Sequence, residues 1–253
     1  LACKLNYFQS IILLFAMVIL IGAVLLMLPI SAQGHTVTPF HEALFTATSA
    51  VCVTGLVVRD TASHWSAFGQ AVLMVLIQIG GLGVITVGAS FSLLSGRRIS
   101  LSQRGRMQEA MSAPKVGGIV RLTGFVIRTS LMIEGIGALC MLPVFCRDFG
   151  VSGIWKAVFH SVSAFCNAGF DLMGTPDTPF VSLTAYRADP VINLTISALI
   201  VVGGIGFLTW DDVRTNLLRF HRYRLQSKVI LAATALLILL PTLYFFCFEF
   251  KGG

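Results

Sequence analysis

The sequence predicts an all-α polytopic membrane protein built from a repeated helical unit. Of its 253 residues, 56% are hydrophobic and only 11% are charged, and the mean hydropathy is +0.86. A soluble domain of ordinary composition carries about 25% charged residues, so a water-soluble globule is excluded. Intrinsic disorder is excluded by the same figures. The 24 glycines fit helices that approach one another closely in lipid.

Five apolar segments are long enough to cross a bilayer, which takes about 20 residues. In chain order, the expected spans cover residues 8–29, 68–94, 119–145, 191–210 and 229–248. Two shorter apolar segments, 39–50 and 153–164, lie after the first and the third span. They are too short to cross, and each precedes an irregular stretch. We therefore expect two re-entrant helices, each followed by a loop that lines a cavity within the membrane.

Two parts of the sequence repeat each other. Residues 41–56 (HEALFTATSAVCVTGL) match residues 155–170 (WKAVFHSVSAFCNAGF) without a gap, at an offset of 114 residues. Farther on, residues 76–86 (LIQIGGLGVIT) match residues 199–209 (LIVVGGIGFLT) at an offset of 123. A unit of span, short helix, loop and span therefore occurs twice.

The repeat also predicts the domain organisation. The fifth span resembles the first helix of a further unit. The expected domains are a first unit over 1–116, a second over 117–228, and the first span of a truncated third unit over 229–253.

Basic residues gather in two connecting segments, 96–116 and 211–228. By the positive-inside rule, these segments and the N-terminus are cytoplasmic, and the short helices enter the membrane from outside. The same charges would suit anionic membrane lipid or an acidic partner. We attribute the net charge of +7 to these cytoplasmic segments, and we expect no nucleic acid partner.

The two loops after the short helices, 51–56 and 165–170, suit the binding of a cation. A helix C-terminus carries about half a negative elementary charge, and free loop carbonyls can replace the hydration shell of a cation. The candidate filter residues are Val53, Thr54, Gly55, Asn167, Ala168 and Gly169, flanked by Cys52 and Cys166. The nearest acids are Asp60 and Asp171, so carbonyls and not carboxylates would select the ion. This favours a large monovalent cation over Ca²⁺ or Mg²⁺.

Longer stretches around these motifs point to a family. They are TATSAVCVTGLVV (46–58), IQIGGLGVITV (77–87), GRRISLSQR (96–104), HSVSAFCNAGFDLMG (160–174) and DPVINLTI (189–196). With them, essentially the whole chain resembles the KtrB family, the membrane subunits of bacterial Ktr potassium-uptake systems, within the Trk/Ktr/HKT superfamily. The fold implied by the resemblance is of potassium-channel type, with four linked units around one pore.

The resemblance also implies a function. It implies potassium uptake across the bacterial cytoplasmic (inner) membrane through a carbonyl selectivity filter, by a homodimer regulated by a cytoplasmic nucleotide-binding ring (KtrA-like). K⁺ would be the transported ion and Na⁺ a stimulating ion, with no covalent cofactor. In plant relatives, serine at the position of Gly55 accompanies sodium preference, so Gly55 indicates potassium. The expected contacts of the regulatory ring are Arg97, Arg98, Arg104 and Arg106.

The chain departs from the family in size, because it contains two units and one helix where the family has four units. A half-length pore subunit that needs two chains per pore, and a non-conducting membrane scaffold, are therefore alternatives. A membrane-embedded enzyme finds little support, because catalytic motifs are absent and no catalytic residue is expected. No metal site other than for K⁺ is expected either. Glu134, inside the third span, is a functional residue, is hydrogen-bonded to a neighbouring helix, or lies near the outer interface of the membrane.

Overall fold

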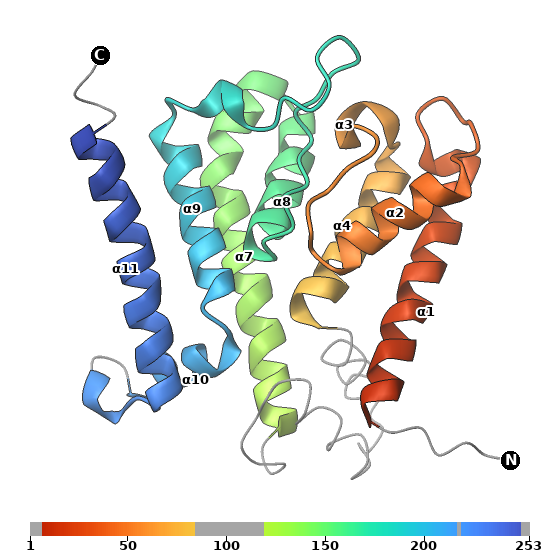
Figure 1. Cartoon of the computed structure of the whole chain (residues 1–253). Coiled ribbons are helices and arrows are strands. Elements are labelled where there is room, and N and C mark those ends of the chain that lie inside the picture. The colour runs from red at the N-terminus through yellow and green to blue at the C-terminus, as the bar shows by residue number, and fades with distance from the viewer. Residues whose placement is uncertain (1–6, 84–118, 217–218, 249–253) are drawn as a thin grey trace, which may run out of the picture. The chain divides into compact units, whose positions relative to one another are not determined.

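The chain folds into helices. The computed structural model describes residues 7–83, 119–216 and 219–248, and within these ranges it contains no β-strand (Figure 1). Its α-helices are α1 (Tyr7–Met27), α2 (Phe40–Val51), α3 (Thr61–His64), α4 (Ala67–Leu82), α7 (Ile119–Phe149), α8 (Ser152–Phe165), α9 (Pro190–Gly204), α10 (Phe207–Asn216) and α11 (Leu225–Phe248). The predicted all-α class is confirmed.

Length and composition fit a membrane protein. Among the described residues, Thr123–Phe149 and Leu225–Phe248 are helices long and apolar enough to cross a bilayer. The bent pair α9 and α10 makes a third if it is counted as one span. Shorter apolar helices cover Ile11–Met27 and Ala67–Leu82.

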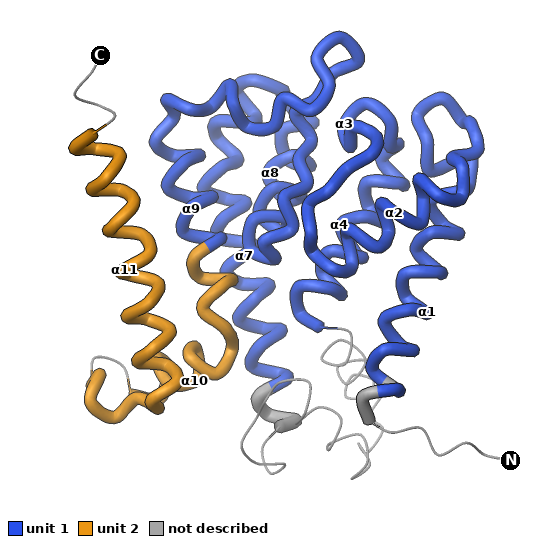
Figure 2. Tube along the Cα trace, in the orientation of Figure 1, with its two compact units in different colours: residues 1–200 blue, residues 201–253 orange. Residues whose placement is uncertain are grey.

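The chain divides into two compact units, residues 1–200 and residues 201–253 (Figure 2). In the first unit, α2 contacts both α1 and α4, and α8 contacts both α7 and α4. Alanines make the buried side of α2, where Ala43, Ala47 and Ala50 are fully buried. Such small side chains let helix backbones approach closely. As a result, the two short helices are each held between longer ones.

The second span of the first sequence repeat, which we call its inner helix, ends earlier than the apolar pattern predicts. A continuous span was expected over 68–94, but α4 ends at Leu82. Gly83 follows with φ 83°, a left-handed conformation that ends α-helices and that glycine adopts without steric cost. The expected residues 84–94 lie outside the described part of the chain. Hydropathy did not reveal the break because the glycine stands inside an apolar run.

The equivalent helix of the second repeat breaks at the equivalent position. A span was expected over 191–210, but α9 ends at Gly204 and α10 begins at Phe207, with a bend of 96° between the two helices. Gly206, with φ 88°, stands in the break, and it matches Gly83 under the offset of 123 residues. The glycine motif of each repeat therefore contains a helix stop.

In the compact unit of residues 201–253, the segment expected as a loop over 211–228 is largely helical. It contains the end of α10, a 3₁₀ turn at Phe220–Arg222 and the start of α11. Asp212 of α10 explains the sharp turn, because its Oδ2 accepts the backbone N–H of Arg224 at 3.0 Å and the hydroxyl of Ser227 at 2.6 Å. These bonds satisfy donors at the N-terminus of α11, as a capping residue does.

Candidate functional site

Both short helices end in the same backbone hydrogen bonds. Three consecutive amides after each helix donate to carbonyls of its last turn. In the first repeat the bonds are Cys52 N–Thr48 O at 2.8 Å, Val53 N–Ala50 O at 3.3 Å and Thr54 N–Ser49 O at 3.0 Å. In the second they are Cys166 N–Val162 O at 2.9 Å, Asn167 N–Ala164 O at 3.0 Å and Ala168 N–Ser163 O at 2.8 Å. Each donor and acceptor matches its counterpart at the offset of 114 residues.

The two loops also share an unusual backbone conformation. Val53 and Asn167 have φ 52° and 58°, and Gly55 and Gly169 both have φ 73°. A left-handed conformation is rare for a β-branched residue such as Val53 and costs on the order of 1–3 kcal/mol. Backbone strain of this kind clusters at functional sites.

The loops meet at the two equivalent glycines. A Cβ atom added to Gly55 would lie 2.8 Å from the carbonyl oxygen of Ala168 and 3.4 Å from the Cα of Gly169. A Cβ added to Gly169 would in turn lie 3.4 Å from the Cα of Gly55. Both positions therefore combine positive φ with a close backbone approach, which only glycine satisfies without strain. Two sequence-predicted sites far apart in the chain are brought together here.

Equivalent serines of the two short helices form hydrogen bonds with the loops that follow them. Thr54 donates its hydroxyl to the Oγ of Ser49 at 2.9 Å, whereas Ser163 donates its hydroxyl to the carbonyl of Phe170 at 2.6 Å. Both serines are buried. The repeat aligned Ser49 with Ser163, but residue type alone did not identify them as supports of the loops.

The glycines of α4 lie against the ends of both short helices. A Cβ on Gly80 would collide with the carbonyl of Val51, and one on Gly81 would collide with the side chain of Cys166. Cys166, predicted to flank the filter, is buried in this contact, whereas Cys52 is exposed. The glycine pair therefore allows α4 to pack directly under both loops.

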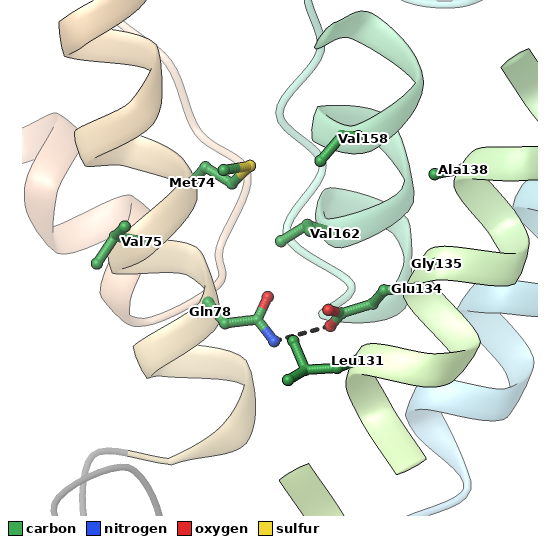
Figure 3. Close-up of a pocket in the computed structure, with 9 residues that line it drawn as sticks. All are labelled: Met74, Val75, Gln78, Leu131, Glu134, Gly135, Ala138, Val158 and Val162. Atoms are coloured by element: carbon green, nitrogen blue, oxygen red, sulfur yellow. Dashed lines mark hydrogen bonds between the residues drawn. The ribbon is translucent and has the colours of Figure 1, made fainter. Parts of the chain in front are cut away.

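A cavity of about 350 Å³ lies between α4, α7 and α8 (Figure 3). Its walls are apolar except for Gln78 and Glu134, whose side chains point toward each other, with Gln78 Nε2 donating to Glu134 Oε1 at 2.8 Å. Glu134 is 5% exposed, and its carbonyl also accepts the hydroxyl of Ser161 at 2.6 Å. The structure therefore shows the hydrogen bond to a neighbouring helix that was one of the alternatives predicted for Glu134.

The predicted contacts of the regulatory ring are not among the residues that the structure describes; they are Arg97, Arg98, Arg104 and Arg106. Across the ranges that the structure does describe, no group of three or more His, Cys, Asp or Glu side chains is arranged to hold a metal ion.

The chain is similar to known cation transporters. Residues 5–249 match the TrkH family, described as a cation transport protein. The chain is 41% identical to the potassium/sodium uptake protein NtpJ of Enterococcus hirae, over 94% of this chain and 51% of that protein. It is 42% identical to the Ktr system potassium uptake protein B of Bacillus subtilis, over 94% of this chain and 52% of the relative. The protein of that name from Vibrio alginolyticus is 38% identical, over 95% and 52%.

The chain thus spans about half the length of the curated relatives it matches. The relatives are transporters and not enzymes, and the family match covers nearly all of the chain. Together with the apolar helices, these similarities place the chain in the TrkH family of membrane cation transport proteins.

Proposed function

We propose that this chain forms part of the pore of a potassium-uptake protein of the Ktr type. Its two loops, Val53–Gly55 and Asn167–Gly169, would contribute backbone carbonyls to one selectivity filter. The observation that carries the proposal is the reciprocal approach of Gly55 and Gly169, in two loops of matching backbone conformation. A filter formed around one axis needs equivalent loops that face one another in this way.

The chemistry of the loops supports a large monovalent cation. The described loop residues carry no carboxylate, so a divalent ion would lack the charged oxygen ligands that it prefers. Carbonyls replace the hydration shell of K⁺ at the loops, and the C-termini of α2 and α8 add partial negative charge. The names of the relatives, which refer to potassium or to potassium and sodium uptake, agree with this choice of ion.

The proposal extends to assembly and location. Two loops do not close a ring, so further loops come from additional units or from a second chain. We place the protein in the bacterial cytoplasmic membrane as a homodimer, with the N-terminus and the basic segments in the cytoplasm. A nucleotide-binding ring would contact the arginines between 97 and 106, and Na⁺ would act as a stimulating ion.

Rubidium uptake into proteoliposomes tests the filter. Gly55→Ser should lower the affinity for rubidium and strengthen competition by sodium, because a side chain at φ 73° displaces the carbonyl of Ala168. Gly150→Ser is the matched control, since Gly150 also has positive φ, at 59°, but an added Cβ there meets no atom within 4 Å.

Two results would contradict the proposal. If Gly55→Ser leaves the competition between rubidium and sodium unchanged, the loop is not the filter. If the unaltered protein carries no flux but retains a cytoplasmic regulatory ring, it is a scaffold and not a pore.

A further inference from the structure

One carboxylate of the first repeat holds a loop of the second. Asp60, at the start of α3, accepts the backbone N–H of Phe180 on Oδ1 at 2.9 Å. Its Oδ2 accepts the backbone N–H and the hydroxyl of Ser63, at 2.8 and 2.7 Å. The residue is only 7% exposed. Both carboxylate oxygens are therefore used, and one of them bonds across the two repeats.

The same carboxylate contacts the loop at a second point, Gly174. A Cβ on Gly174 would collide with the carboxylate group of Asp60, so the backbone of Gly174 rests directly on it. Between Gly174 and Phe180 the loop is closed by its own bonds: Thr175 N–H donates to the carbonyl of Thr178, and Thr178 N–H donates to Thr175 Oγ1, both at 3.1 Å. Both ends of this self-bonded turn lie on Asp60.

This contact lies close to both loops in the sequence. Asp60 follows Gly55 by five residues, and Gly174 follows Gly169 by five residues. The two loops therefore meet at the glycines, and the segments that follow them meet again at Asp60. Between these points, the segment after Gly169 is anchored to α8, because His160 Nε2 accepts the N–H of Leu172 at 3.2 Å.

The charge of Asp60 is maintained by its partners. Burial raises the pKa of the carboxyl, but the hydrogen bonds from Phe180 and Ser63 outweigh burial, and the net pKa lies below its usual range. Asp60 is therefore a carboxylate at neutral pH, and its bonds are charge-assisted. Such bonds are about twice as strong as neutral ones.

We propose that Asp60 is a positioning residue that fixes the spacing of the two loops at their outer ends and so sets the ion selectivity of the pore. The effect on selectivity rests on the proposed function, whereas the clamp on the loop at Gly174–Phe180 does not. We assign Asp60 this positioning role and not that of an ion ligand, because it is 7% exposed and its oxygens already accept three hydrogen bonds from Ser63 and Phe180.

The test is a set of substitutions in the whole protein. Asp60→Ala should reduce the discrimination between rubidium and sodium by at most about tenfold, the factor that corresponds to the one charge-assisted bond, to Phe180, that crosses between the repeats. Asp177→Ala is the matched control, since it removes an exposed carboxylate from the same turn without touching the clamp. Asp60→Asn, which keeps an oxygen for the N–H of Phe180, serves if the alanine variant fails to fold.

The collision at Gly174 supplies a second, more specific readout. Gly174→Ala alone should reduce discrimination, because its methyl group displaces the carboxylate. Combined with Asp60→Ala, it should add little, because the group it strikes is gone. Additive effects of the two substitutions, or equal effects of Asp60→Ala and Asp177→Ala, would overturn the proposal.

Thiol labelling separates the clamp from the pore. Thr178→Cys should react faster with a membrane-impermeant maleimide when Asp60→Ala is present, but not when Asp177→Ala is present. In each case, the labelling of the exposed native thiols Cys52, Cys140 and Cys247, measured without Thr178→Cys, is subtracted. If the unaltered protein does not transport rubidium, the proposed function is wrong, but this comparison still shows whether Asp60 holds the loop at Gly174–Phe180. If labelling is the same in all three proteins, the clamp is wrong whatever the transport shows.

Discussion

Gln78 of α4 and Glu134 of α7 are 56 positions apart in the sequence and share a hydrogen bond of 2.8 Å. The bond joins the inner helix of the first repeat to the first helix of the second (Figure 3). Glu134 is fixed a second time, because Ser161 of α8 bonds its carbonyl. Gln78 lies just before Gly80 and Gly81, the residues on which both loops rest. The pair therefore holds α4 in register beneath the candidate filter.

Removing one member of this pair should cost more than removing both. Glu134→Leu leaves the amide of Gln78 without its partner in an apolar cavity, which should lower the free energy of unfolding by about 1–3 kcal/mol. Adding Gln78→Leu removes the stranded group and should restore much of the loss. Thermal unfolding in detergent measures both. Equal destabilisation by the single and the double variant would show that the bond does not stabilise the protein.

The helix stop in the second repeat should depend on glycine itself. Gly206→Ala should destabilise the protein by about 1–2 kcal/mol, because φ 88° is unfavourable for an L-residue. No atom lies within 4 Å of a Cβ added there, so crowding does not contribute. Gly124→Ala is the matched control, since Gly124 lies within α7 with equally open surroundings, and alanine is favoured there. A melting temperature of Gly206→Ala at or above that of Gly124→Ala would contradict this account.

The sequence predicted the positions of the candidate loops because the repeat is strong there. Matching Gly55 with Gly169 identified two sites that the structure brings into contact. Hydropathy, by contrast, did not reveal the helix ends at Gly83 and Gly206, because the hydrophobicity of a residue does not indicate its backbone φ. The partner of Asp60 could not be predicted either, since Phe180 offers only a backbone N–H, 120 residues away.

Asp212 should be essential for the turn between α10 and α11. It is 4% exposed and bonds both Arg224 N–H and the Ser227 hydroxyl. Asp212→Ala should cost about 0.5–2 kcal/mol, as the loss of a helix cap does. It should also speed hydrogen exchange at the amides that begin α11. Asp211→Ala is the control, because among the described residues its carboxylate pairs with the Arg224 guanidinium, at 3.1 Å, and not with the amides that begin α11. If both variants exchange equally fast, the cap does not hold the turn.

Asp171 and Asp60 should affect stability with opposite dependence on pH. Burial raises the pKa of Asp171, helped by the charge of Asp60, although the N–H of Met173 lowers it. Its pKa in the folded protein is above that in the unfolded chain, so ionisation disfavours the fold, and the penalty is complete above the folded pKa. Asp171→Asn should therefore stabilise the protein at neutral pH, and the gain should shrink as the pH falls toward the ordinary range of an aspartate, about 4.

For Asp60, whose pKa in the folded protein is lowered, the sign is reversed. The stability that its carboxylate contributes is present above the pKa of the unfolded chain and is lost as the pH falls through the pKa of the folded protein. Asp60→Asn should therefore destabilise the protein at neutral pH, with a deficit that shrinks only in strong acid. Unfolding measured from neutral to acidic pH compares the two variants directly, and a loss of stability in Asp171→Asn at neutral pH would show that the Met173 bond outweighs burial.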